Sequence, residues 1–205
     1  MSNIFIHGLG QNASSWDQTI AHLGNGADMA CPDLFSLLGD RSCTYDNLYS
    51  VFSRYCKKQN KPLTLCGLSL GAVLALNYAL DHQANVRSLI LIGAQYKMPR
   101  TLLRVQNVAF RLMPNAVFKS MGISKSNAIR LTESMSTLDF SDRLKSISCP
   151  TLVICGEKDK ANMKGAQGLA DNIKNAKLHI VEGTGHELNT QAPTQLADVI
   201  RYLIQ

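Results

Sequence analysis

The chain has 205 residues, of which 45% are hydrophobic and 18% charged, and its formal net charge at pH 7 is +6. These values fit one soluble globular domain with a sizeable buried core. The longest apolar candidate, residues 89–92, is far too short to span a bilayer, and the first residues have no signal-peptide pattern. We therefore expect a cytoplasmic protein without a transmembrane segment.

Short apolar runs alternate with helical patterns along the chain. The predicted strands cover residues 3–7, 27–31, 62–66, 87–93, 150–155 and 177–181, and the predicted helices cover residues 14–23, 44–59, 70–82, 162–174 and 191–204. Strands that alternate with helices form a parallel sheet with helices on both faces. The strand at residues 27–31 is short and polar, which favours a position at the edge of the sheet.

The sequence Gly-Leu-Ser-Leu-Gly occupies residues 67–71, between the third predicted strand and an apolar helix. A sharp turn from strand to helix lifts the Ser69 hydroxyl above the sheet and strains its backbone, so both flanking positions have to be small. The start of the helix offers free N–H groups to a developing oxyanion. Ser69 is therefore the candidate nucleophile.

A nucleophilic serine needs a base, and the base needs a group that orients it. His186 follows the strand at residues 177–181 and a glycine turn, whereas the other histidines have plainer structural explanations. Two acids follow the strand at residues 150–155. Asp159 stands a loop's length past the strand end, and Glu157, which is nearer the strand, is its competitor.

The chain order of serine, acid and histidine resembles that of the α/β-hydrolases, and so does the sequence His-Gly-Leu-Gly at residues 7–10 after the first strand. The resemblance covers nearly the whole chain and points to small esterases and thioesterases. It implies an α/β-hydrolase fold with a reduced, mostly parallel six-stranded sheet, and it favours Asp159 as the acid. It also implies an oxyanion hole made by the backbone N–H groups of Leu9 and Leu70.

Two departures from this family pattern concern the N-terminal half. Many α/β-hydrolases have two strands before the one that leads into the His-Gly-x-Gly turn, and this chain begins at that strand. Residues 33–39 also stand where relatives often carry an Asp-x-Pro-Gly-x-Gly sequence. The shape of the pocket near that loop therefore does not follow from the resemblance.

Residues 96–140 break the alternation, at the position where hydrolases of this fold insert a cap. We expect a single domain over residues 1–205 with this helical cap at about 96–140, its first helix starting at Pro99 and ending at Pro114. The helix is broadly apolar, and we expect Leu102, Phe110 and Met113 to line an acyl pocket. The alternative is that these side chains only pack the cap onto the body.

The same region carries most of the net charge, with seven basic and two acidic residues. Arg100, Arg104 and Arg111 fall on one helical face. This face is open to two interpretations: a solvated surface, or a contact for an anionic carrier such as coenzyme A or an anionic membrane surface. We expect no nucleic-acid partner, because no basic motif is interleaved with aromatic residues.

The six cysteines form no Cys-x-x-Cys pair, and no His, Cys and carboxylate cluster has metal-ligand spacing. Buried free thiols explain the cysteines better than disulfides do. The sequence therefore predicts an enzyme that needs neither cofactor nor metal, namely a serine hydrolase that cleaves a carboxylic ester or thioester of a small to medium apolar acyl group. The alternatives are a receptor that keeps the triad with negligible turnover, or carbon–carbon hydrolase, perhydrolase or lyase chemistry.

Overall fold

A single six-stranded sheet forms the centre of the molecule. The computed structural model describes residues 2–24, 28–60 and 62–204, without the side chains of Leu102 and Ser120. The strands are β1 (Ser2–Ile6), β2 (Asp28–Ala30), β3 (Leu63–Leu68), β4 (Val86–Ile92), β5 (Thr151–Gly156) and β6 (Ala176–Val181). They pair in parallel in the order β2-β1-β3-β4-β5-β6, which confirms the predicted fold class and the edge position of β2.

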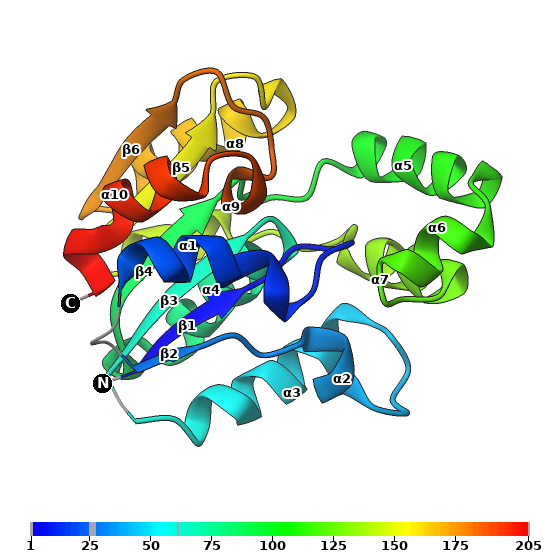
Figure 1. Cartoon of the computed structure of the whole chain (residues 1–205), viewed down its shortest axis with the longest axis horizontal. Coiled ribbons are helices and arrows are strands. Elements are labelled where there is room, and N and C mark those ends of the chain that lie inside the picture. Colours follow the sequence, from blue (N-terminus) through cyan, green and yellow to red (C-terminus); the bar gives the residue numbers. More distant parts are fainter. Residues whose placement is uncertain (1, 25–27, 61, 205) are drawn as a thin grey trace.

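Helices cover both faces of the sheet, as Figure 1 shows. They are the 3₁₀ helices η1 (Ala13–Trp16), η2 (Gln83–Asn85) and η3 (Ser141–Ser146), and the α-helices α1 (Asp17–Leu23), α2 (Leu34–Leu38), α3 (Tyr45–Lys57), α4 (Leu70–Asp81), α5 (Arg100–Leu112), α6 (Asn115–Ser120), α7 (Lys125–Met135), α8 (Lys160–Asn172), α9 (Leu188–Gln191) and α10 (Pro193–Ile204). Helices α1 and α10 pack side by side on one face. No described helix is both long and apolar enough to cross a membrane.

Alternating residues of the central strands enter two separate hydrophobic clusters. In β4, for example, Leu89 and Leu91 belong to the cluster that includes α3 and α4, whereas Ile90 and Ile92 belong to the cluster that includes η1 and α10. This period of two is the pattern expected for strands that are buried on both faces. In covered sheets of this kind, ligands bind outside the carboxyl ends of the strands.

The predicted elements correspond to observed ones, with differences at particular ends. Strand β3 continues to Leu68, two residues beyond the predicted end. Helix α2 was not expected; the Asp33 carboxylate accepts a hydrogen bond from the Ser36 amide at 2.8 Å, and Leu34 and Leu38 are buried. The cysteines of the described chain are free thiols, four of them buried.

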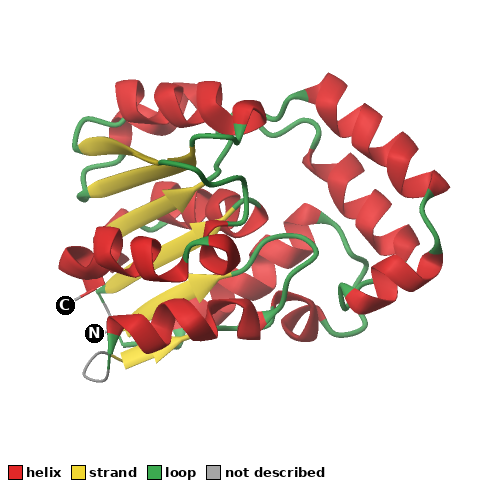
Figure 2. Ribbon diagram, turned by 45° about the horizontal axis from the view of Figure 1, so that its top comes forward, coloured by secondary structure: helices red, strands yellow, loops and turns green. Residues whose placement is uncertain are grey.

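Residues 96–140, called the cap segment here, hold α5, α6 and α7. In Figure 2 these helices lie beyond the ends to which the strand arrows point. The two ends of the segment meet at an antiparallel bridge between Lys97 and Asp139, whose side chains form a 2.8 Å ion pair. Backbone bonds from Met98 to Leu138 and from Phe140 to Tyr96 reinforce this junction. The cap segment therefore leaves and re-enters the body at one place.

Candidate active site

Ser69 occupies a strained turn between β3 and α4. Its φ of 53° and ψ of −113° make it the one non-glycine residue with positive φ in the part of the chain that the structure describes. A Cβ atom at Gly67 would lie 2.3 Å from the Gly71 carbonyl oxygen, and one at Gly71 would lie 2.2 Å from the Ile6 carbonyl oxygen. Both positions therefore exclude any side chain, as the sequence pattern predicts.

His186 follows β6 on a loop and points its Nδ1 atom at Asp159. The distance from Nδ1 to the Asp159 Oδ2 atom is 2.7 Å, and the carboxyl side chain is 5% exposed. Because an ionised carboxylate can only accept a hydrogen bond, Nδ1 carries the proton and donates. This tautomer leaves Nε2 of His186 with a free lone pair, which is what a general base requires.

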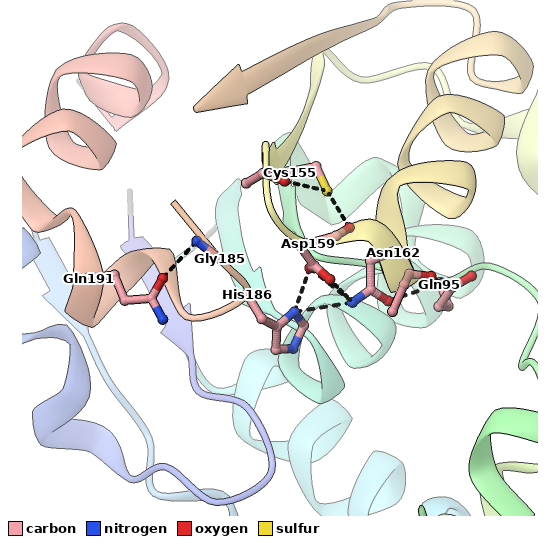
Figure 3. A network of polar contacts seen from close by, with 9 residues as sticks. Gln95, Cys155, Asp159, Asn162, Gly185, His186 and Gln191 are labelled. Carbon is pink, nitrogen blue, oxygen red and sulfur yellow. Dashed lines mark hydrogen bonds and ion pairs between the residues drawn. The ribbon is translucent and has the colours of Figure 1, made fainter. Parts of the chain in front are cut away.

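The Asp159 carboxylate has a second donor in Asn162, on the first turn of α8. The Asn162 amide nitrogen lies 2.9 Å from both carboxylate oxygens, as Figure 3 shows. Burial raises the pKa of Asp159, but the hydrogen bonds from His186 and Asn162 outweigh it and hold the pKa below its ordinary value. The carboxyl group of Asp159 is therefore held in its ionised form.

Gln95 extends this network. Its amide nitrogen donates to the Asn162 Oδ1 atom at 3.0 Å and to the Ala161 carbonyl at 3.1 Å. These bonds fix which end of the Asn162 amide faces Asp159, because the oxygen is already used as an acceptor. Sequence reasoning found neither Gln95 nor Asn162, since neither belongs to a recognisable motif.

Glu157, the competing acid, lies in a different environment. Its Oε2 atom accepts a hydrogen bond of 2.9 Å from the Gly183 amide, and the residue is exposed. The structure thus brings Asp159 and His186 together, while Glu157 stabilises the glycine turn that precedes the histidine.

Gly93, at the end of β4, permits the close approach of the histidine ring. A Cβ atom there would lie 2.8 Å from Cε1 and 2.9 Å from Nδ1 of His186. The φ of +56° at Gly93 also disfavours any other residue. A glycine after a strand gives no functional signal by itself, and it was not singled out from the sequence.

The His-Gly-Leu-Gly turn is held by its own histidine. Buried His7 donates from Nδ1 to the Gly8 carbonyl at 2.9 Å, and its Nε2 atom accepts from the Leu34 amide at 3.0 Å. Burial lowers the pKa of His7, against smaller opposing effects of the Gly8 carbonyl and Asp33. His7 is therefore uncharged near neutral pH, and its two hydrogen bonds stabilise the turn.

A buried amide pair connects this turn to the loop of the candidate base. The side chains of Gln11 and Asn189 exchange two hydrogen bonds, each of 3.1 Å. Asn189 lies on α9, three residues after His186, and it also donates to the Ser15 carbonyl. The positions of the two loops are thus linked directly across the edge of the sheet.

Ser69 and His186 line one cavity of about 190 Å³. Leu9 and Leu70, the predicted oxyanion donors, also line it. As the first residue of α4, Leu70 has an amide N–H without an acceptor inside the helix. The remaining walls come from the body and from the cap segment: Val73, Gly93, Gln95, Met98, Pro99, Leu103, Gln106, Thr132, Met135 and Asn162.

Two of the three predicted acyl-pocket residues lie away from this cavity. Phe110 and Met113 do not line this cavity, and the Phe110 ring packs edge-on against Phe118 of α6, with ring centroids 5.3 Å apart. The side chain of Leu102 lies outside the described residues. Among the described side chains of α5, Leu103 and Gln106 line the cavity. Among the described residues, no group of three His, Cys, Asp or Glu could hold a metal ion.

Comparisons with known proteins identify the family of the chain. A model of the alpha/beta hydrolase family matches residues 4–199. Mouse monoacylglycerol lipase ABHD6 is 21% identical to this chain over an alignment 249 positions long, which covers 97% of this chain and 74% of that protein.

Solved structures show the same fold at low sequence identity. An esterase from Exiguobacterium antarcticum aligns with a TM-score of 0.81 and 18% identity, covering 100% of this chain and 91% of its own. A carboxylesterase structure from Nitrososphaera gargenis aligns with a TM-score of 0.83 and 17% identity, covering 98% and 89%. The chain belongs to the alpha/beta hydrolase family.

Proposed function

We propose that this protein is a serine hydrolase that cleaves carboxylic esters or thioesters of small to medium apolar acyl groups. The observation that carries the proposal is one shared cavity. Strained Ser69 and His186 both line it, and His186 is hydrogen-bonded to buried Asp159. The names of the relatives, a lipase and esterases, support cleavage of an ester bond.

The first half of the reaction forms an acyl-enzyme. The Ser69 hydroxyl oxygen attacks the substrate carbonyl while Nε2 of His186 takes the hydroxyl proton. Asp159 keeps the ring oriented and stabilises its charged form. When the tetrahedral intermediate collapses, His186 returns the proton to the leaving alcohol or thiol, and the acyl group remains on Ser69.

The second half releases the acid. Water gives a proton to His186 and attacks the acyl carbonyl, and the Ser69 oxygen then leaves with that proton. In both halves the Leu9 and Leu70 amides would hold the negative oxygen. Each such donor contributes about 3 kcal/mol to the transition state in comparable enzymes.

The cavity sets the expected size of the acyl group. A cavity of about 150 Å³ holds one benzene ring, and the cavity here measures about 190 Å³. Its apolar walls include Val73, Met98, Leu103 and Met135. Because three of these four come from the cap segment, we propose that this segment acts as a cap that selects the acyl group.

A fluorophosphonate probe tests the nucleophile. Intact protein should gain the mass of one probe, and Ser69→Ala should gain none. Ser42→Ala, an exchange at an exposed serine, is the matched control and should label like the unaltered protein. Labelling that persists in Ser69→Ala would overturn the assignment of Ser69.

Multiple-turnover kinetics separate an enzyme from a receptor that only retains the triad. Neutral p-nitrophenyl esters of two to twelve carbons provide the series. The enzyme should turn over many equivalents and reach an optimum acyl length, because each buried methylene adds about 0.8 kcal/mol until the cavity is full. A single stoichiometric burst without further product would instead favour the receptor.

Paired alanine variants locate the acyl wall. Leu103→Ala should shift the optimum to longer chains, because Leu103 lines the cavity. Phe110→Ala, on the same helix, should leave the optimum in place, because Phe110 packs on α6. The reverse result would mean that the acyl chain binds on the Phe110 side of the helix.

A further inference from the structure

A second recess lies beside the catalytic cavity, between α5 and α7. It measures about 360 Å³, and three arginines line it: Arg100, Arg104 and Arg111. Leu103 and Thr132 line this recess as well as the catalytic cavity, so the two spaces meet at these side chains. We call the recess the arginine groove.

The charge of the arginine groove is only partly neutralised. Arg111 forms an exposed ion pair of 3.0 Å with Glu133, and the Nε atom of Arg100 donates to the Ser136 carbonyl at 3.2 Å. Among the described residues, no hydrogen bond or ion pair is formed by the side chain of Arg104. The lining therefore keeps a net charge of +2 from three arginines and one glutamate.

A buried amide also faces this space. Asn107 is 6% exposed and lines the groove. Its Oδ1 atom accepts from the Thr132 hydroxyl. Its Nδ2 group can only donate, so Asn107 adds a neutral N–H donor to the lining of the groove.

We propose that the arginine groove binds a phosphate group on the leaving part of the substrate. Arg100 and Arg104 are four residues apart on α5, so their Cα atoms are about 6 Å apart along the helix axis, at 1.5 Å per residue. Guanidinium groups at this spacing can hold one phosphate or the two halves of a pyrophosphate between them. The proposal rests on the serine-hydrolase function, with the acyl group in the catalytic cavity and the phosphate outside it.

Two pairs of substrates test the proposal, and each pair differs only in phosphate. S-Butyryl-4′-phosphopantetheine is compared with S-butyryl-pantetheine, and 1-butyrylglycerol 3-phosphate with 1-butyrylglycerol. The protein should favour the phosphorylated member of at least one pair, and the favoured pair identifies the source of the phosphate. The preference should shrink as the ionic strength rises, because exposed charges are screened.

Charge variants then assign the preference to the groove. Arg104→Gln should raise KM for the favoured phosphorylated substrate roughly five- to tenfold and leave its neutral counterpart unchanged. Arg54→Gln, at an exposed position on α3, is the matched control and should change neither. Glu133→Gln frees Arg111 and should lower KM two- to threefold, whereas exposed Glu182→Gln should not.

Failure of this proposal can be told apart from failure of the hydrolase function. Turnover of the neutral substrates with no preference for phosphate in either pair would overturn the arginine groove and leave the hydrolase standing. If no substrate turns over, calorimetry of S-butyryl-4′-phosphopantetheine and of 1-butyrylglycerol 3-phosphate with Ser69→Ala decides. Binding that Arg104→Gln weakens would support the groove, and absence of binding, or binding that Arg104→Gln does not change, would overturn it.

Discussion

The sheet edge that carries Ser69 and His186 and the cap segment are built in opposite ways. At the edge, main chains approach so closely that a single Cβ atom at Gly71 would lie 2.2 Å from the Ile6 carbonyl oxygen. On α5 of the cap segment, by contrast, Val105 is 62% exposed and Leu112 is 82% exposed. The edge is fixed by backbone packing, whereas the cap segment presents side chains that few neighbours constrain.

If the proposed function holds, this difference indicates which property each of the two regions controls. Small changes at the sheet edge displace several groups together and should affect chemistry or folding. Changes on the outer surface of the cap segment remove few contacts, so they should affect which substrate binds. The following expectations test this division, from the largest effect to the smallest.

Loss of the orienting acid should have the largest effect on the chemistry. Asp159→Asn should lower kcat about 10⁴-fold, since an amide in this position favours the wrong tautomer of the histidine. Glu157→Gln removes a nearby carboxylate that accepts a hydrogen bond from the Gly183 amide of the glycine turn, and it should change kcat less than about twofold. Steady-state kinetics with a neutral ester measure both. A crippled Glu157→Gln enzyme would reverse the assignment.

Alanine substitutions at two glycines should destabilise the sheet edge more than the cap segment. Gly71→Ala should cost about 3 kcal/mol or more, because the new methyl group collides with main chain of β1. Gly122 of the cap segment has a φ of +69° with nothing within 4 Å of the new atom. Gly122→Ala should therefore cost only about 1 kcal/mol of conformational strain. Urea unfolding compares the two, and equal losses would contradict the division.

Asn162 should behave as a positioning residue of the edge. Asn162→Ala removes the amide that faces both oxygens of Asp159, so kcat should fall roughly tenfold while KM changes little. The pKa of Asp159 should also rise toward its ordinary value, because one of the bonds that lowers it is lost. Asn172→Ala, at the other end of α8, should leave the kinetics unchanged. Proton titration by NMR distinguishes an electrostatic role from loss of packing.

Buried His7 should give the stability of the sheet edge a dependence on pH. Its pKa is lowered by folding, so below about pH 6.5 the unfolded chain binds a proton that the folded chain resists. The free energy of unfolding should fall on acidification by up to about 1.4 kcal/mol per pH unit, until the folded pKa is reached. His7→Gln should flatten this slope, and His22→Gln, an exchange at an exposed position, should keep it.

The arrangement of the sheet edge that carries Ser69 and His186 follows local rules, so the sequence can predict it. A parallel sheet places consecutive strand ends along one side, so motifs after β1, β3, β5 and β6 are expected to lie near one another. Ser69 could be found because its strain demands two glycines at fixed positions. His186 and Asp159 could be found because they follow strands in a recognised order, and the structure brings these two together.

The remaining features depend on packing that no local pattern contains. Helix α2 was missed because five residues are too few to show a helical period. The pattern of α5 does not reveal that α6 would cover Phe110 and leave Leu103 to face the cavity. Asn162 and Gln95 act only through neighbours that are distant in the sequence, so their hydrogen bonds required the folded structure.

The bridge between Lys97 and Asp139 has a consequence for the evolution of this fold. The two ends of the cap segment pair with each other. The length of the chain between them therefore does not change how the segment joins the sheet. Closing a loop costs only about 0.6 kcal/mol more for each doubling of its length. Insertions, deletions or replacement of the whole segment between Met98 and Leu138 should therefore be tolerated. Such changes would alter which substrates bind without altering the strands that hold Ser69 and His186.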